Sequence, residues 1–109
     1  MCIFCKIATG EIPSKKILEN NDFLAFYDIN PQSAIHALVI PKTHFESFEH
    51  VDCDTMSKAT AFIQEVTKTL GINESGYRLI TNIGHNGGQE VAHLHFHILG
   101  GEKLGKLVC

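Results

Sequence analysis

Alternating apolar and polar residues near the end of the chain predict a β-strand. In HLHFHILGG, residues 93–101, every second residue of the first five is a histidine, so that His93, His95 and His97 alternate with Leu94, Phe96 and Ile98. Because successive side chains of a strand point to opposite faces, the apolar residues are expected to face a core and the histidines to face the other way. On a helix the three histidines would scatter around the axis, so a strand over residues 92–99 is predicted.

Short apolar runs bounded by turn residues indicate four further strands, at residues 16–19, 23–29, 34–40 and 77–82. The first two are separated by Asn20-Asn21-Asp22, a spacer of hairpin length. The third is expected to end before Pro41, because proline cannot donate a backbone hydrogen bond to a sheet. The pattern therefore predicts an antiparallel sheet that begins as a meander.

One helix is predicted where apolar residues recur with the three- and four-residue spacing of a helical face, at positions 56, 59, 63, 66 and 70. Asp54 is the expected N-cap of this helix, and Gly71 the residue at which it stops. The helix and the strands together predict an α+β fold. The length of 109 residues suits a single domain, residues 1–109.

Composition narrows the classes of partner. The formal net charge of −3 leaves no basic footprint for nucleic acid or for an anionic membrane. No apolar run has membrane-spanning length, and the start of the chain lacks the features of a secretory signal, so a soluble cytoplasmic protein is expected. In a reducing compartment its cysteines are expected to be free thiols or metal ligands: Cys2, Cys5, Cys53 and Cys109.

The row of histidines leaves three interpretations open: catalysis, metal binding or a structural role. Neutral imidazole serves as nucleophile, acid, base or metal ligand near neutral pH. In the preceding loop, the backbone N–H groups of Gly87-Gly88-Gln89 are expected to form a small nest for a phosphate. An anion site beside a row of imidazoles suits transfer at phosphorus, which needs donors for the phosphate oxygens, a nucleophile and a proton source.

Several stretches resemble the Hint branch of the histidine triad (HIT) family. HLHFHIL follows that family's motif, and the likeness extends to IFCKIATGEIPS, FLAFYDINPQSAIHALVIPKTH and GYRLITNIGHNGGQEVAHLHFHILGG. Gly100-Gly101 is a Hint-like feature, whereas the dinucleoside-polyphosphate branch has a different run there. The resemblance implies a five-stranded antiparallel sheet with one long helix and a short N-terminal helix, paired into a homodimer with a continuous ten-stranded sheet.

The resemblance also implies an activity: hydrolysis of purine nucleoside, mainly adenosine, 5′-phosphoramidates through a covalent nucleotidyl-histidine intermediate. His95 matches the family's nucleophile, His97 the histidine that donates to a phosphate oxygen, and His36 the outlying member of the cluster. Asp28 matches the acid that holds the ribose hydroxyls. The other nucleotide-binding positions carried over are apolar ones around the base, Ile3, Phe4, Phe26 and Ile29, and phosphate-side ones, Asn82, Gly88 and Gln89.

A metal site is implied in the same way. Cys2 and Cys5 have the spacing of a zinc half-site, and with His44 and His93 they match the structural zinc set of some bacterial Hint-like proteins. Four protein ligands would leave no open position for water, so this zinc is expected to be structural, and catalysis is expected to need no metal.

Two departures from the family pattern leave substrate choice open. Glu90 stands where the Hint pattern often has serine, and the tail EKLGKLVC lacks the aromatic and proline-rich ending of some Hint members. Three alternatives to the phosphoramidase also remain open. They are a dinucleoside polyphosphate hydrolase, a metalloenzyme that uses a metal-activated water, and a non-enzymatic nucleotide- or zinc-binding interaction module.

Overall fold

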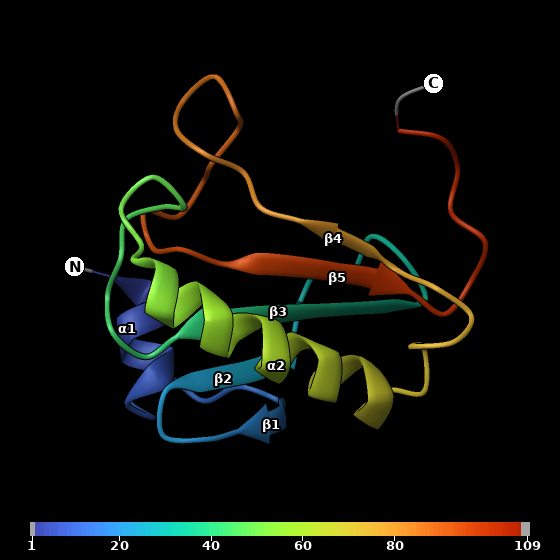
Figure 1. Ribbon diagram of the computed structural model, residues 1–109, viewed down its shortest axis with the longest axis horizontal. Helices are drawn as coiled ribbons and strands as arrows, with labels where there is room; N and C mark the ends of the chain where they lie inside the picture. The colour runs from blue at the N-terminus through green and yellow to red at the C-terminus, as the bar shows by residue number, and fades with distance from the viewer. Residues whose placement is uncertain (1, 108–109) are drawn as a thin grey trace.

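A five-stranded antiparallel sheet with two helices forms the fold in the computed structural model, which describes residues 2–107; the predicted thiol of Cys109 lies outside this range. The elements in chain order are α1 (Ile3–Ala8), β1 (Lys16–Glu19), β2 (Phe23–Tyr27), β3 (Ile35–Pro41), α2 (Cys53–Thr69), β4 (Arg78–Ile80) and β5 (Phe96–Gly100). The strand order is β1-β2-β3-β5-β4 (Figure 1). The predicted fold class, including the short N-terminal helix, is confirmed.

The two helices pack on opposite faces of the sheet. Alternate residues of β2 and β3 contact α2, while those between them pack with Phe4 and Ile7 of α1. Strands buried on both faces have continuous apolar sequences, as FLAF in β2 and ALVI in β3 show. In Figure 1 the long helix α2 crosses in front of the sheet. Among residues 2–107, no helix combines the length and apolar character needed to cross a membrane.

The alternation in HLHFHI is confirmed, but the strand is shorter than predicted. Leu94, Phe96 and Ile98 belong to the core under α2, so the histidines face the α1 side. Residues 92–95 lie outside β5, whose pairing with β3 begins at Phe96 opposite Val39. The N–H of Leu94 instead donates to the carbonyl of Phe45, at 2.7 Å, in the loop that follows β3. This bond to a loop explains why the ladder starts later than the sequence pattern indicates.

Other element ends also differ from the prediction. The strand β2 ends at Tyr27 because Asp28 Oδ1 accepts the N–H of Asn30, at 2.8 Å, and turns the chain. Pro41 belongs to β3 as its last residue, where it lies opposite Phe23. The strand predicted at residues 34–40 is observed as β3, Ile35–Pro41, and the strand predicted at residues 77–82 is observed as the shorter β4, Arg78–Ile80.

The long helix starts earlier than predicted. Its N-cap is Asp52, whose carboxylate accepts the N–H of Thr55 at 3.1 Å and the Thr55 hydroxyl at 2.6 Å, whereas Asp54 is an exposed residue of the first turn. At the other end the predicted stop is confirmed. Gly71 follows the C-cap with φ of +73°, a conformation that glycine adopts without steric cost.

Candidate active site

A cavity of about 1030 Å³ lies on the α1 side of the sheet. Apolar side chains from α1, β2 and β3 line one part of it, among them Phe4, Ile7, Phe26 and Leu38. Polar side chains from β3, from the β4–β5 loop and from the histidine segment line the rest, among them His36, Asn82, His95 and His97. The cavity therefore offers an apolar compartment that continues into a polar one, which suits a ligand with an aromatic ring and a polar group.

His95 is held by backbone atoms so that one ring nitrogen stays available. Its Nδ1–H donates to the carbonyl of His93 at 2.7 Å, and its own carbonyl accepts the Thr81 hydroxyl at 2.8 Å. The residue is 6% exposed, and its ring packs edge-on against Phe4, with ring centroids 5.1 Å apart. Because Nδ1 carries the proton, the lone pair is on Nε2, so His95 is oriented as a nucleophile.

His36 and His97 form a hydrogen-bonded pair whose direction is fixed. The backbone N–H of Gln32 donates to His36 Nδ1 at 3.0 Å, so the proton of the neutral ring is on Nε2. His36 Nε2 then donates to His97 Nδ1 at 2.9 Å, which leaves the proton of His97 on its own Nε2. Asp28 Oδ2 lies 3.5 Å from His36 Nε2. The arrangement gives the cavity an imidazole N–H donor beside His95.

Burial keeps this pair neutral. It lowers the pKa of His36, against the opposing effect of the Asp28 carboxylate. Burial also lowers the pKa of His97, as do its neighbours His95 and His36, while the carboxylates of Asp28 and Glu90 act in the other direction. Both rings are therefore neutral near pH 7, as their hydrogen bonds require.

The lowered pKa of His36 predicts how stability depends on pH. An unfolded histidine has a pKa of about 6.5, so below that pH the unfolded chain binds more protons than the folded one. The free energy of unfolding should be fully retained above about pH 6.5 and should fall as the pH drops through the lower pKa of the folded state. Urea unfolding between about pH 5 and 8 measures this slope, which His36→Asn should make shallower. His85→Asn, at an exposed loop position, is the control; equal slopes for wild type and His36→Asn would contradict the prediction.

Most of the predicted nucleotide-binding residues line the cavity: Ile3, Phe4, Phe26, Asp28, Ile29, Asn82 and Gly88. Gln89 is not among the lining residues. Its side-chain amide is used inside the loop, where Oε1 accepts the N–H of Gly84 at 2.9 Å and Nε2 donates to the carbonyls of Glu46 and Val91 at 2.6 and 2.9 Å. The structure thus gives Gln89 a role in holding the β4–β5 loop.

The predicted phosphate nest is wrong for two of its three N–H groups. The N–H of Gly88 donates to the carbonyl of His85 and that of Gln89 to the carbonyl of Gly84, both at 3.1 Å. Position 87 requires glycine for a steric reason, because a Cβ there would lie 2.2 Å from the carbonyl oxygen of Ile83. These glycines let the loop close tightly on itself.

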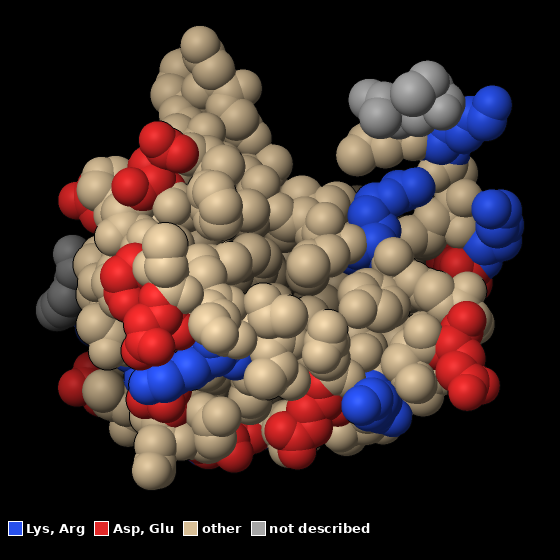
Figure 2. All heavy atoms as spheres, viewed as in Figure 1, with Lys and Arg blue, Asp and Glu red and all other residues tan. Residues whose placement is uncertain are grey.

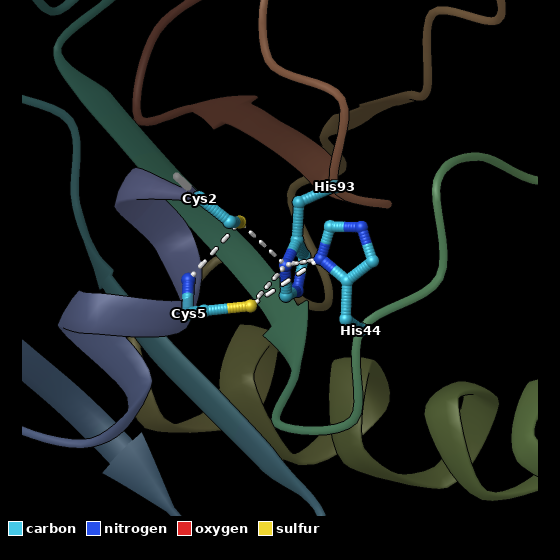
Figure 3. A group of neighbouring side chains, drawn as sticks. All are labelled: Cys2, Cys5, His44 and His93. Carbon is cyan, nitrogen blue, oxygen red and sulfur yellow. Dashed lines mark hydrogen bonds between the residues drawn. The ribbon is translucent and has the colours of Figure 1, made fainter.

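The predicted metal ligands converge from three segments of the chain (Figure 3). Cys2 and Cys5 come from the start of α1, His44 from the loop after β3 and His93 from the segment before β5. The distances from His93 Nδ1 are 3.2 Å to Cys2 Sγ, 3.5 Å to Cys5 Sγ and 3.1 Å to His44 Nδ1, and Cys5 Sγ lies 3.3 Å from His44 Nδ1. All four donor atoms lie within 4.8 Å of one another.

The surroundings of this cluster favour a cation. His93 is fully buried, and its Nε2–H donates to the carbonyl of Pro41 at 2.9 Å, so its Nδ1 lone pair faces the two sulfurs. Burial and the neighbouring Cys2 raise the pKa of the Cys5 thiol, since two thiolates so close would repel each other. Tetrahedral zinc with bonds of about 2.0–2.3 Å holds ligand atoms roughly 3.3–3.8 Å apart, close to the observed separations. The donor set fits zinc.

Asp28, His36 and His97 form a second group with donor atoms within 4.8 Å. Here the lone pair of His97 Nδ1 already accepts the hydrogen bond from His36, and His36 Nδ1 accepts from Gln32. The Nδ1 lone pairs of both histidines are therefore already used in hydrogen bonds within the protein.

Comparison with known proteins agrees with this geometry. The model of the HIT domain family matches residues 9–104. The chain belongs to the HIT family. An uncharacterized HIT-like protein of Helicobacter pylori is 57% identical over 103 residues, which cover 94% of this chain and 99% of that protein.

Solved structures of HIT proteins superimpose closely. A HIT family hydrolase from Legionella pneumophila is 41% identical, covers 96% of both chains and has a TM-score of 0.91. A histidine triad nucleotide-binding protein from Candida albicans is 33% identical, covers all of this chain and 87% of that one, and has a TM-score of 0.85. The cavity described above is therefore the candidate site of a HIT domain.

Backbone groups make up the part of this HIT site that sequence reasoning missed. The N–H of Gln32 sets the tautomer of His36, and the carbonyls of His93 and Pro41 set those of His95 and His93. No residue type encodes such contacts, so the sequence offers no signal for them. The missed apolar lining residues, Ile7, Ile12, Leu38 and Val91, are indistinguishable from core residues by sequence.

Proposed function

We propose that this HIT protein is a nucleotide-binding hydrolase that cleaves purine nucleoside, mainly adenosine, 5′-phosphoramidates. The observation that carries the proposal is His95, whose Nδ1–H is bound to the His93 carbonyl and whose Nε2 lone pair is available in the cavity. Similarity to the hydrolase from Legionella pneumophila supports the hydrolytic activity, and similarity to the nucleotide-binding protein from Candida albicans supports the binding of a nucleotide.

Binding uses both parts of the cavity. The apolar part, with Phe4 and Phe26 in edge-on contact at 5.9 Å, suits an aromatic base. Asp28 is partly buried and lines the cavity, and its carboxylate can accept hydrogen bonds from two vicinal ribose hydroxyls. The α-phosphate then lies toward His95 and His97.

The first chemical step forms a covalent intermediate. His95 Nε2 attacks the α-phosphorus, the bond from phosphorus to the amine breaks, and the amine leaves with a proton taken from solvent water. His97, whose Nε2 carries a proton, donates to a phosphate oxygen. The positive charge that develops on the His95 ring is stabilised by the bond from Nδ1–H to the His93 carbonyl.

Hydrolysis of the intermediate completes the reaction. Water attacks the phosphorus and releases a proton to solvent, the bond to Nε2 of His95 breaks, and nucleoside monophosphate leaves while the imidazole recovers its lone pair. Imidazole is a good leaving group after phosphorylation on nitrogen, so the intermediate turns over.

Asp28→Asn is expected to weaken binding of adenosine monophosphate by about tenfold and of its 2′-deoxy analogue much less, because only the ribose offers two donors to the carboxylate. Titration calorimetry measures both affinities. Asparagine can still accept the turn hydrogen bond from Asn30, so the fold should persist. Equal losses for the two nucleotides would show that Asp28 serves only the turn.

We further propose that Cys2, Cys5, His44 and His93 hold a structural zinc ion. The separations of the four donor atoms and the buried, oriented His93 support this assignment. When bound, zinc joins α1 to the two loops that carry the histidines and takes no part in the reaction.

A homodimer with a continuous ten-stranded sheet is also proposed. Strand β4 is an edge strand of the sheet, and Tyr77, Leu79 and Ile83 on and beside it are exposed to 36%, 47% and 37%. Sedimentation equilibrium is expected to give twice the chain mass, and Leu79→Lys to shift the protein toward the monomer. A wild type that stays monomeric at concentrations of about 100 μM would contradict the dimer.

One assay separates the proposed function from its alternatives. The purified protein is incubated with adenosine 5′-phosphoramidate or with diadenosine tetraphosphate, each with and without a chelator. Release of AMP from the phosphoramidate, unaffected by the chelator, is expected. Preference for the dinucleotide would favour the polyphosphate hydrolase, loss of turnover with chelator the metalloenzyme, and no turnover at all the binding module.

A further inference from the structure

The histidine part of the cavity carries an acidic side chain where an anion has to bind. Glu90 lines the cavity together with Asn82, Gly88, His95 and His97. Among the described lining residues the one Lys or Arg is Lys15, which precedes β1, and β2 and β3 lie between β1 and β5. Figure 2 shows no blue atoms on the protruding loop between β4 and β5, whose residues 81–89 are all uncharged. Two carboxylates, Asp28 and Glu90, therefore line the cavity, and Glu90 is the one to which the proposed binding of the ribose gives no role.

The carboxylate of Glu90 has no partner within residues 2–107: none of the ion pairs there includes it, and no hydrogen bond reaches it. It nevertheless acts on the site, because its charge, after that of Asp28, raises the pKa of His97 against the effect of burial. An unpaired carboxylate close to His97 repels the oxygens of a bound phosphate, unless the substrate brings a positive charge of its own.

The loop keeps Glu90 at the rim. The preceding residue, Gln89, is bound through its side-chain amide to the carbonyls of Glu46 and Val91 and to the N–H of Gly84. Both residues line the cavity, but Glu90 is exposed to solvent whereas His95 is buried. In an in-line displacement the leaving group departs on the side of the phosphorus opposite the nucleophile, so it points outward, toward the rim.

We propose that Glu90 is a specificity-determining residue that binds a positive charge on the leaving group. The favoured substrates are nucleoside 5′-phosphoramidates whose amine carries a second, protonated amino group, as in a diamine or the side chain of a basic amino acid. The inference rests on the proposed phosphoramidase function and narrows its substrate class. The reaction itself is unchanged: the phosphorus–nitrogen bond breaks, and the diamine leaves with one added proton while its far ammonium stays paired with Glu90.

Two substrates that differ in one charge test this. The adenosine 5′-phosphoramidate of 1,4-diaminobutane has a terminal ammonium where that of pentylamine has a methyl group. Wild type is expected to favour the diamine substrate by about tenfold in kcat/KM, with a smaller preference at high salt. Glu90→Gln should remove the preference, mainly through a higher KM for the diamine substrate, and Glu90→Asp should keep part of it.

Glu74→Gln, at an exposed turn position away from the cavity, is the matched control and should keep the wild-type preference. Melting temperatures of all variants check that they fold. Equal kcat/KM values for the two substrates in wild type, or a preference that survives in Glu90→Gln, would overturn the assignment of Glu90 while leaving the phosphoramidase intact.

If wild type hydrolyses neither substrate, the proposed phosphoramidase activity is overturned. The charge selectivity of Glu90 can then still be tested separately by measuring binding. Calorimetry then compares the two compounds as ligands of wild type and Glu90→Gln. Tighter binding of the charged compound that depends on Glu90 supports the charge selectivity, and equal binding overturns it.

Discussion

His95→Asn is expected to lower the rate of phosphoramidate hydrolysis by about 10³-fold or more, because it removes the atom that attacks phosphorus. Nucleotide affinity should change by less than about threefold, since the apolar part of the cavity and Asp28 are untouched. The asparagine amide can still donate to the His93 carbonyl that now binds Nδ1. A loss in kcat with nearly constant affinity is the signature of a nucleophile rather than of a binding residue.

Two measurements check the role of His95. Single-turnover kinetics give the rate of the chemical step, and mass spectrometry of rapidly quenched wild type should show a nucleotidyl group on His95 that is absent from the variant. His85→Asn, in the exposed β4–β5 loop, is the control for replacing a histidine and should retain activity. Near-normal turnover by His95→Asn would refute the covalent mechanism.

Cys5→Ser is expected to abolish zinc binding and to lower the melting temperature by about 10 °C or more, because the bound metal contributes directly to folding. Wild type purified without chelator should contain about one zinc ion per chain. Activity per folded molecule should remain substantial, since none of the four ligands attacks phosphorus. Loss of the zinc site should therefore change the stability and the metal content of the protein more than its rate of hydrolysis.

Elemental analysis and thermal unfolding measure both quantities. Cys53→Ser is the matched control, because this thiol is exposed at the first turn of α2 and far from the other cysteines in sequence. It should keep both zinc and melting temperature. A metal-free wild type, or a Cys5→Ser protein that retains its zinc, would refute the structural zinc site.

The sequence predicted the elements whose periodicity is strong. The alternation around Phe96 and the helical spacing from Met56 both reflect burial of one face, and burial leaves a pattern in residue types. Element ends were less predictable. Asp52 and Asp54 are equally good N-caps by residue type, and only the structure shows that the carboxylate of Asp52 accepts from the N–H and hydroxyl of Thr55.

The site was predictable in its side chains but not in its backbone. Resemblance to a family indicated the three histidines and the four metal ligands, and the structure brings each group together. The tautomers that give His95 a free Nε2 depend on a carbonyl and on an N–H of Gln32, which every residue type supplies. The loop was misjudged for a related reason, because Gly88 has an N–H that can serve either a ligand or the loop itself.

The Cys/His cluster brings together residues that are far apart in the sequence. Cys2 and His93 are 91 positions apart in sequence, yet their donor atoms lie 3.2 Å apart. The zinc ion proposed for this cluster would act as a cross-link that closes a very long loop, and such closure removes conformational entropy from the unfolded chain. During synthesis this closure has to wait until His93 has left the ribosome, 91 residues after Cys2, so the two cysteines have only His44 as a histidine partner until then.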